Sequence, residues 1–202
     1  MTQEESNITE YISLECRWFL VKPIAKEILD MFRGLDVETR TDVYWTRNMY
    51  LVHPILDEGI KLREGGLEIK TILKKVEGLA IPGKVQKWRK IRKPIPPDID
   101  LSNGWTEVPK RRQMIRYELF PDHIAGPVSH FPDQGCHIEL TSFESPFENY
   151  WTFGIEAYGH DYELNGNLVR VYDKIVGQSS ELKQILNNES SRSYPEWLAG
   201  IK

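Results

Sequence analysis

The stretch Ser13-Leu-Glu-Cys-Arg-Trp18 alternates strictly between polar and apolar residues. Successive side chains of a β-strand point to opposite faces, so this period of two predicts a strand. Its three odd-numbered residues would form a polar face that carries one carboxylate and one guanidinium group. Its three even-numbered residues would form an apolar face suited to packing against another layer.

The same alternation recurs on both sides of Gly65-Gly66, as expected of a β-hairpin. Lys61 and Arg63 share one face before the turn, and Glu68 and Lys70 share one after it. Further along, residues 136–141 alternate in the same way, with His137, Glu139 and Thr141 on the polar face. Charged faces therefore belong to several strands far apart in the chain.

The period of two dominates the whole sequence and predicts eight strands, at residues 10–20, 40–46, 58–64, 67–75, 83–92, 111–119, 135–144 and 150–158. Helical spacing predicts helices at 23–33 and 167–176 and a weaker one at 180–186, and proline predicts long loops at 94–109 and 121–134. We expect an α+β, mostly β protein, in which an antiparallel sheet of eight strands is closed or nearly closed into a barrel with a few helices outside. It would form one domain over residues 10–202, after a flexible N-terminus at 1–9.

Composition narrows the class of protein. The 202 residues carry a formal net charge of −4, which argues against a general nucleic-acid binder. No apolar run approaches the roughly 18 residues of a membrane span, and the N-terminus does not resemble a signal peptide. Two cysteines, Cys16 and Cys136, suit a reducing compartment. We expect a soluble cytoplasmic protein without a membrane partner; its oligomeric state stays open.

The charged strand faces have two interpretations. In an ordinary sandwich they would meet water. In a barrel with helices packed outside, the apolar faces would point outward and the charged faces inward. Basic and acidic side chains projecting into one lumen would then form a site for an anion, held directly or through a divalent metal.

Several of these segments resemble motifs of the CYTH superfamily, the triphosphate tunnel metalloenzymes, which include thiamine triphosphatases, inorganic triphosphatases and one class of adenylate cyclases. The family's N-terminal strand has the pattern Glu-x-Glu-x-Lys, and here Ser13-Leu-Glu15-Cys-Arg17 corresponds to it. The other similar segments, in the family's order, are Asp42-Val-Tyr44, Lys61-Leu-Arg63, Glu68-Ile-Lys70, Glu139-Leu-Thr141, residues 151–157 and residues 193–198. The resemblance implies an eight-stranded antiparallel tunnel.

The resemblance also implies roles for individual residues. The carboxylates Glu15, Glu139 and Glu156 would hold Mg²⁺ or Mn²⁺ or orient the attacking water. The phosphate oxygens would be contacted by five basic residues: Arg17, Lys61, Arg63, Lys70 and Arg116. This sequence departs from the family pattern at Ser13, which replaces the first glutamate, and at Arg17, which replaces the lysine. His137 is either a general base or ligand, or a lumen histidine bonded to a neighbouring carboxylate.

Three functional hypotheses follow. The first is hydrolysis of a triphosphate or other phosphorylated anion with a divalent metal. The second is a binding module of the same fold without hydrolytic activity, which Ser13 favours. The third is a lipocalin-like barrel for apolar ligands, which would require Leu14, Leu62 and Ile69 to point inward.

Overall fold

The computed structural model describes residues 8–35 and 42–201. Within these ranges the chain forms nine strands: β1 (Thr9–Val21), β2 (Asp42–Leu51), β3 (Glu58–Arg63), β4 (Gly66–Val76), β5 (Val85–Pro94), β6 (Trp105–Leu119), β7 (Ile124–Val128), β8 (Gly135–Phe143) and β9 (Tyr150–Tyr158). The same ranges contain four α-helices: α1 (Lys26–Leu35), α2 (Leu164–Ile175), α3 (Ser180–Ile185) and α4 (Tyr194–Gly200).

Eight of the strands close into an antiparallel barrel. They follow the order β2-β3-β4-β5-β1-β9-β8-β6, and β6 pairs back to β2 to complete the ring. The ninth strand, β7, adds to β6 outside this ring. The mostly β, closed eight-stranded barrel expected from the sequence is confirmed.

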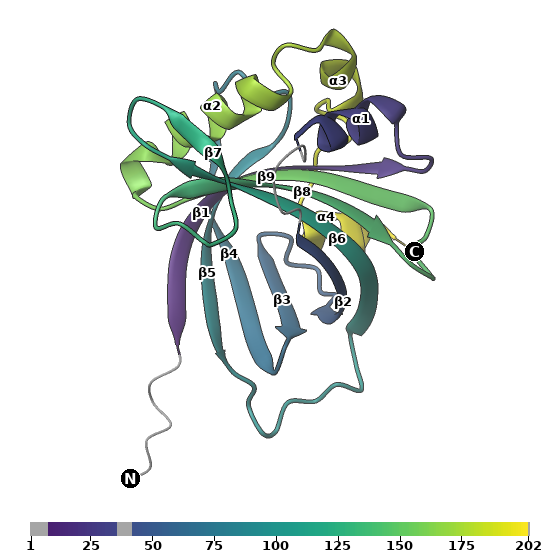
Figure 1. Ribbon diagram of the computed structural model, residues 1–202. Coiled ribbons are helices and arrows are strands. Elements are labelled where there is room, and N and C mark those ends of the chain that lie inside the picture. The colour runs from purple at the N-terminus through teal and green to yellow at the C-terminus, as the bar shows by residue number, and fades with distance from the viewer. Residues whose placement is uncertain (1–7, 36–41, 202) are drawn as a thin grey trace.

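The larger hydrophobic cluster of the described residues lies outside the barrel wall, under the helices. Leu14, Cys16 and Trp18 of β1 are buried in one cluster with Leu168 and Tyr172 of α2. Figure 1 shows α1, α2 and α3 gathered on one side of the barrel. The even-numbered face of β1 therefore points outward and its charged odd-numbered face points inward, which disfavours a lumen for apolar ligands.

The inner face changes from charged to aromatic where α4 packs against it. Trp197 of α4 stacks on Phe19 and Phe143, with ring centroids 4.8 and 4.6 Å apart. The helix begins with a capping box, in which the Ser193 hydroxyl accepts a hydrogen bond from the backbone of Glu196 and the Glu196 carboxylate accepts one from the backbone of Ser193. This aromatic cluster fills one end of the lumen.

The structure corrects two predicted loops. The predicted loop 121–134 contains β7, and the predicted loop 94–109 contains the first residues of β6. Proline favoured the loop interpretation, but Pro127 lies in an edge strand, where a missing N–H is tolerated. The helix predicted at 23–33 runs from Lys26 to Leu35 instead.

Some expectations fall at the edges of the described ranges. Residues 1–7 of the predicted flexible N-terminus lie outside them, and β1 begins at Thr9. The first residues of the strand predicted at 40–46 also lie outside them. In the described part of the chain, no helix has the length and apolar character needed to cross a membrane.

Candidate functional site

The lumen holds a cavity of about 340 Å³ next to the aromatic end. Nine basic side chains of the described residues line it: Arg17, Lys61, Arg63, Lys70, Lys90, Arg92, Lys110, Arg112 and Arg116. Four acidic side chains line it as well: Glu15, Glu68, Glu139 and Glu156. A protein with a net negative charge thus concentrates positive charge in one pocket. The eight residues predicted to bind metal or phosphate all line this cavity, while those roles stay predictions.

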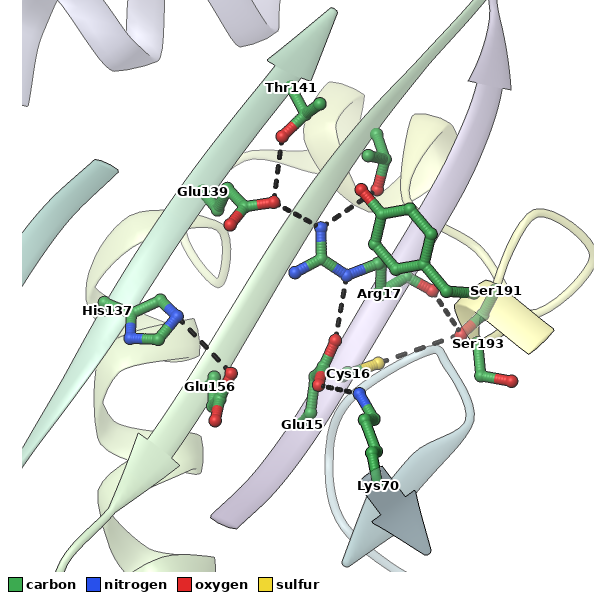
Figure 2. A network of polar contacts seen from close by, with 12 residues as sticks. Glu15, Cys16, Arg17, Lys70, His137, Glu139, Thr141, Glu156, Ser191 and Ser193 are labelled. Atoms are coloured by element: carbon green, nitrogen blue, oxygen red, sulfur yellow. Dashed lines mark hydrogen bonds and ion pairs between the residues drawn. The ribbon is translucent and has the colours of Figure 1, made fainter. Parts of the chain in front are cut away.

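A chain of alternating charges crosses the pocket floor (Figure 2). Lys70 Nζ lies 2.5 Å from Glu15 Oε2, and the other Glu15 oxygen accepts a 2.8 Å hydrogen bond from Arg17 Nε. Arg17 Nη1 donates at 2.8 Å to Glu139 Oε1, and Arg112 Nε donates at 2.9 Å to Glu139 Oε2. Each oxygen of the two glutamates therefore has a cationic partner.

Strand order explains how Arg17 reaches both glutamates. Arg17 shares the inner face of β1 with Glu15, whereas Glu139 belongs to β8, two strands away. The strand between them, β9, places Gly154 opposite Arg17 on one side and opposite Glu139 on the other. Because Gly154 has no side chain, the guanidinium can lie across it, and a Cβ there would be 2.7 Å from Arg17 Cζ.

The third glutamate has its own basic partners. Glu156 pairs with Lys90 of β5, and its Oε2 lies 3.4 Å from His137 Nε2. His137 is thus placed beside a carboxylate, as the second interpretation from the sequence expected. The Glu156 carboxylate is buried, as are those of Glu15 and Glu139.

The two glutamates of this network are held in their ionised form. Burial opposes ionisation of Glu15, but Lys70, Arg17 and Lys90 outweigh it and lower the pKa of its carboxyl. Burial likewise opposes ionisation of Glu139, and Arg112 and Arg17 hold its pKa well below the usual range. The two carboxylates therefore stay ionised throughout the physiological pH range.

A lysine next to the aromatic end was not predicted. Lys110 is 3% exposed, and its Nζ donates to the phenol oxygens of Tyr50 at 2.6 Å and Tyr194 at 3.2 Å. Burial lowers its pKa to about 8. Lys110, Arg112 and Arg116 are even-numbered residues of β6 and share one face of the strand. The alternation that placed Glu15 and Arg17 on a charged face therefore also indicated Lys110 and Arg112.

Another group of basic side chains is partly open to solvent. The side chains of Lys61, Arg63 and Arg92 are 26, 27 and 38% exposed. Lys61 Nζ pairs with Glu68 at 2.7 Å, and Arg63 Nη2 lies 3.3 Å from Glu64. These partly exposed ion pairs are weaker than buried ones, so an entering anion can compete for the cations.

The three glutamates do not fit a divalent metal in this arrangement. Mg²⁺ and Mn²⁺ require carboxylate oxygens with available lone pairs. Glu15 and Glu139 direct theirs at Arg17, Lys70 and Arg112, and Glu156 is engaged by Lys90. Over residues 8–35 and 42–201, no three His, Cys, Asp or Glu side chains gather in a way that could hold a metal ion.

The comparisons with known proteins add little to this geometry. No family model and no curated protein matches the chain. Among solved structures, the barrel is similar to the S. pombe Pct1 RNA triphosphatase, solved in complex with the Spt5 CTD. The two are 9% identical with a TM-score of 0.33, and the match covers 86% of this chain and 85% of that chain. A likeness this distant carries no argument about activity.

Proposed function

We propose that the barrel binds a small phosphorylated anion, such as a triphosphate, in its basic pocket. The observation that carries this proposal is the excess of nine basic over four acidic side chains around one cavity of an acidic protein. Phosphate oxygens are bound by lysine as a point charge and by arginine through paired N–H donors. A pocket of this composition would repel cations and attract multiply charged anions.

Pocket size and the position of the cations support a ligand with several phosphates. A cavity of about 340 Å³ lies at the small end of the usual range for ligand sites. Lys61 and Arg63 offer charge where the pocket meets solvent, and Lys110 offers it next to the aromatic end. A linear polyanion would contact several of these cations at once, because Lys70 and Arg116 line the same cavity.

Of the two phosphate-related hypotheses, metal-dependent hydrolysis is less favoured than binding without hydrolysis. Phosphoryl transfer depends on charge neutralisation around the transferred group, which metal ions commonly supply. Here the carboxylates expected to hold that metal are paired with arginine and lysine instead. We therefore propose a binding module, with metal-dependent turnover as the alternative that the same experiment detects.

Thermal unfolding with tripolyphosphate in EDTA tests the proposal. A ligand present at 100 times its Kd stabilises the folded state by about 2.7 kcal/mol. We expect tripolyphosphate to raise the melting temperature by an amount that corresponds to a stabilisation of this order. Arg63→Gln, inside the pocket, should reduce the shift. Arg89→Gln, a matched change on the exposed outer face of β5, should leave it unchanged. Absence of any shift, or equal loss in both variants, would contradict the proposal.

Phosphate release is measured in parallel with Mg²⁺ or Mn²⁺ present, using tripolyphosphate, thiamine triphosphate and ATP. We expect no release above the protein-free control. Metal-dependent release that is lost in Glu15→Gln, a variant checked for folding, would instead establish the hydrolase.

A further inference from the structure

We propose that the Arg17 guanidinium takes the place of a divalent cation between Glu15 and Glu139, so that the pocket needs no metal to bind its anion. Two buried carboxylates, Glu15 and Glu139, face the same volume from strands separated by β9. Such a pair is a common binding arrangement for Mg²⁺ or Mn²⁺. In this protein the volume between them holds a guanidinium group (Figure 2).

Both carboxylates are already engaged by basic side chains. Arg17 Nε and Nη1 each lie 2.8 Å from a different glutamate, so one side chain bridges both. The outer oxygens are engaged by Lys70 and Arg112, and Thr141 donates a further 2.8 Å hydrogen bond to Glu139 Oε1. A metal would have to displace several charge-assisted hydrogen bonds, which are the stronger kind.

The barrel wall leaves space for the guanidinium group of Arg17 at Gly154. Gly154 leaves the floor open, and any larger residue would put Cβ within 2.7 Å of Arg17 Cζ and Nη2. The Tyr194 ring lies on the guanidinium, with its centroid 5.2 Å from Arg17 Cζ. Arg17 is thus held by two carboxylates and an aromatic ring in a volume that a side chain at position 154 would otherwise occupy.

The positive charge around the two glutamates also opposes the entry of a metal ion. A divalent cation at this place would meet Arg17, Lys70 and Arg112, all of them held against the same two glutamates. Like charges at such short range repel strongly in a pocket of low dielectric constant. The surrounding cations therefore neutralise the carboxylates and oppose metal entry together.

The inference predicts that a metal site appears when the guanidinium is removed. Arg17→Gln removes the arginine hydrogen bonds to Glu15 Oε1 and Glu139 Oε1, and it removes one positive charge. Among the described residues, Glu139 Oε1 then keeps only the hydrogen bond from Thr141. We expect this variant to bind one Mn²⁺ per chain at least tenfold more tightly than the unmodified protein. Arg17→Lys, which keeps the charge, should exclude Mn²⁺ as the unmodified protein does.

The experiment is a titration of the full chain with MnCl₂, in which electron paramagnetic resonance reports the free ion and no phosphate is present. The double variant Arg17→Gln with Glu139→Gln should lose the gained binding, and circular dichroism establishes that each variant is folded. Stoichiometric Mn²⁺ binding by the unmodified protein would overturn the inference even if no Arg17 variant folds. Failure of a folded Arg17→Gln variant to gain Mn²⁺ binding would overturn it too.

The outcome is independent of the proposed phosphate ligand. If Mn²⁺ binds the unmodified protein while tripolyphosphate still stabilises it in EDTA, only the metal-replacement inference fails. If Mn²⁺ is excluded as expected but no phosphorylated anion stabilises the protein, only the proposed function fails.

Discussion

The contact between Gly154 and Arg17 gives the sharpest test of how the pocket floor is built. Gly154→Ala adds one methyl group, which would lie 2.7 Å from Arg17 Cζ and Nη2 and 3.1 Å from Nη1. Such distances are far inside ordinary contact, so the guanidinium must move. Its two buried ion pairs at 2.8 Å resist that movement.

We expect Gly154→Ala to lower the free energy of unfolding by about 1–3 kcal/mol, the usual range for overpacking a well-packed site. When Arg17 is first replaced by alanine, the obstacle is gone, and the same glycine change should cost less than about 0.5 kcal/mol. The coupling energy between the two positions is therefore expected to be on the order of 2 kcal/mol, within the range found for residues in contact.

Urea unfolding of the four proteins in this double-mutant cycle, followed by tryptophan fluorescence, measures the coupling from the shifts of the transition midpoint. Gly126→Ala is the matched control, because a Cβ at that edge-strand glycine meets nothing within 4 Å. The reasoning is refuted if Gly154→Ala costs no more than Gly126→Ala, or if it costs the same with and without the arginine.

Three further outcomes follow from the pocket and its closed end. Burial lowers the pKa of Lys70 and of Lys110 to about 8, so these ammonium groups lose their protons as the pH rises through 8. Affinity for tripolyphosphate should therefore fall between pH 7 and 9. Calorimetry in two buffers of different ionisation enthalpy should detect proton uptake on binding near pH 8. An affinity that does not change with pH over this range would contradict this. Trp197→Ala should cost about 3–5 kcal/mol in urea unfolding because it empties the aromatic cluster, whereas Trp45→Ala, at a position 67% exposed, should change stability by less than about 0.5 kcal/mol. Ser193→Ala removes the N-terminal cap of α4 and should cost about 1 kcal/mol; an unchanged midpoint would show that the capping box contributes nothing.

Strand alternation made the barrel and its charged lumen predictable. The period of two specifies which side chains share a face, and closure of the sheet then places all those faces around one space. Glu15, Arg17 and Lys70 were found in this way. Lys110, between the predicted loop 94–109 and the predicted strand 111–119, and Arg112, inside that strand, carried the same signal but were not assigned to the site.

The ion pairing of the pocket could not be predicted in the same way. Contact between Arg17 and Glu139 depends on the insertion of β9 between their strands and on a glycine at its crossing point. A sequence pattern gives the face of a residue but not its neighbour two strands away. The short helix α4 was not predicted, although Ser193 and Glu196 have the spacing of a capping box and Pro195 lies in the first turn.

The pairing of β1 with β9 has a consequence for biosynthesis. Residues 13–21 form hydrogen bonds with residues 150–158, so β1, which also pairs with β5, gains its second neighbour only when β9 has been made. Until that segment leaves the ribosome, the sheet is open and two strand edges lack their partners. The helix that covers the apolar face of β1 follows later still, at residues 164–175. Ring closure therefore requires β9 to have been made, and the apolar face of β1 stays uncovered until α2 has followed it.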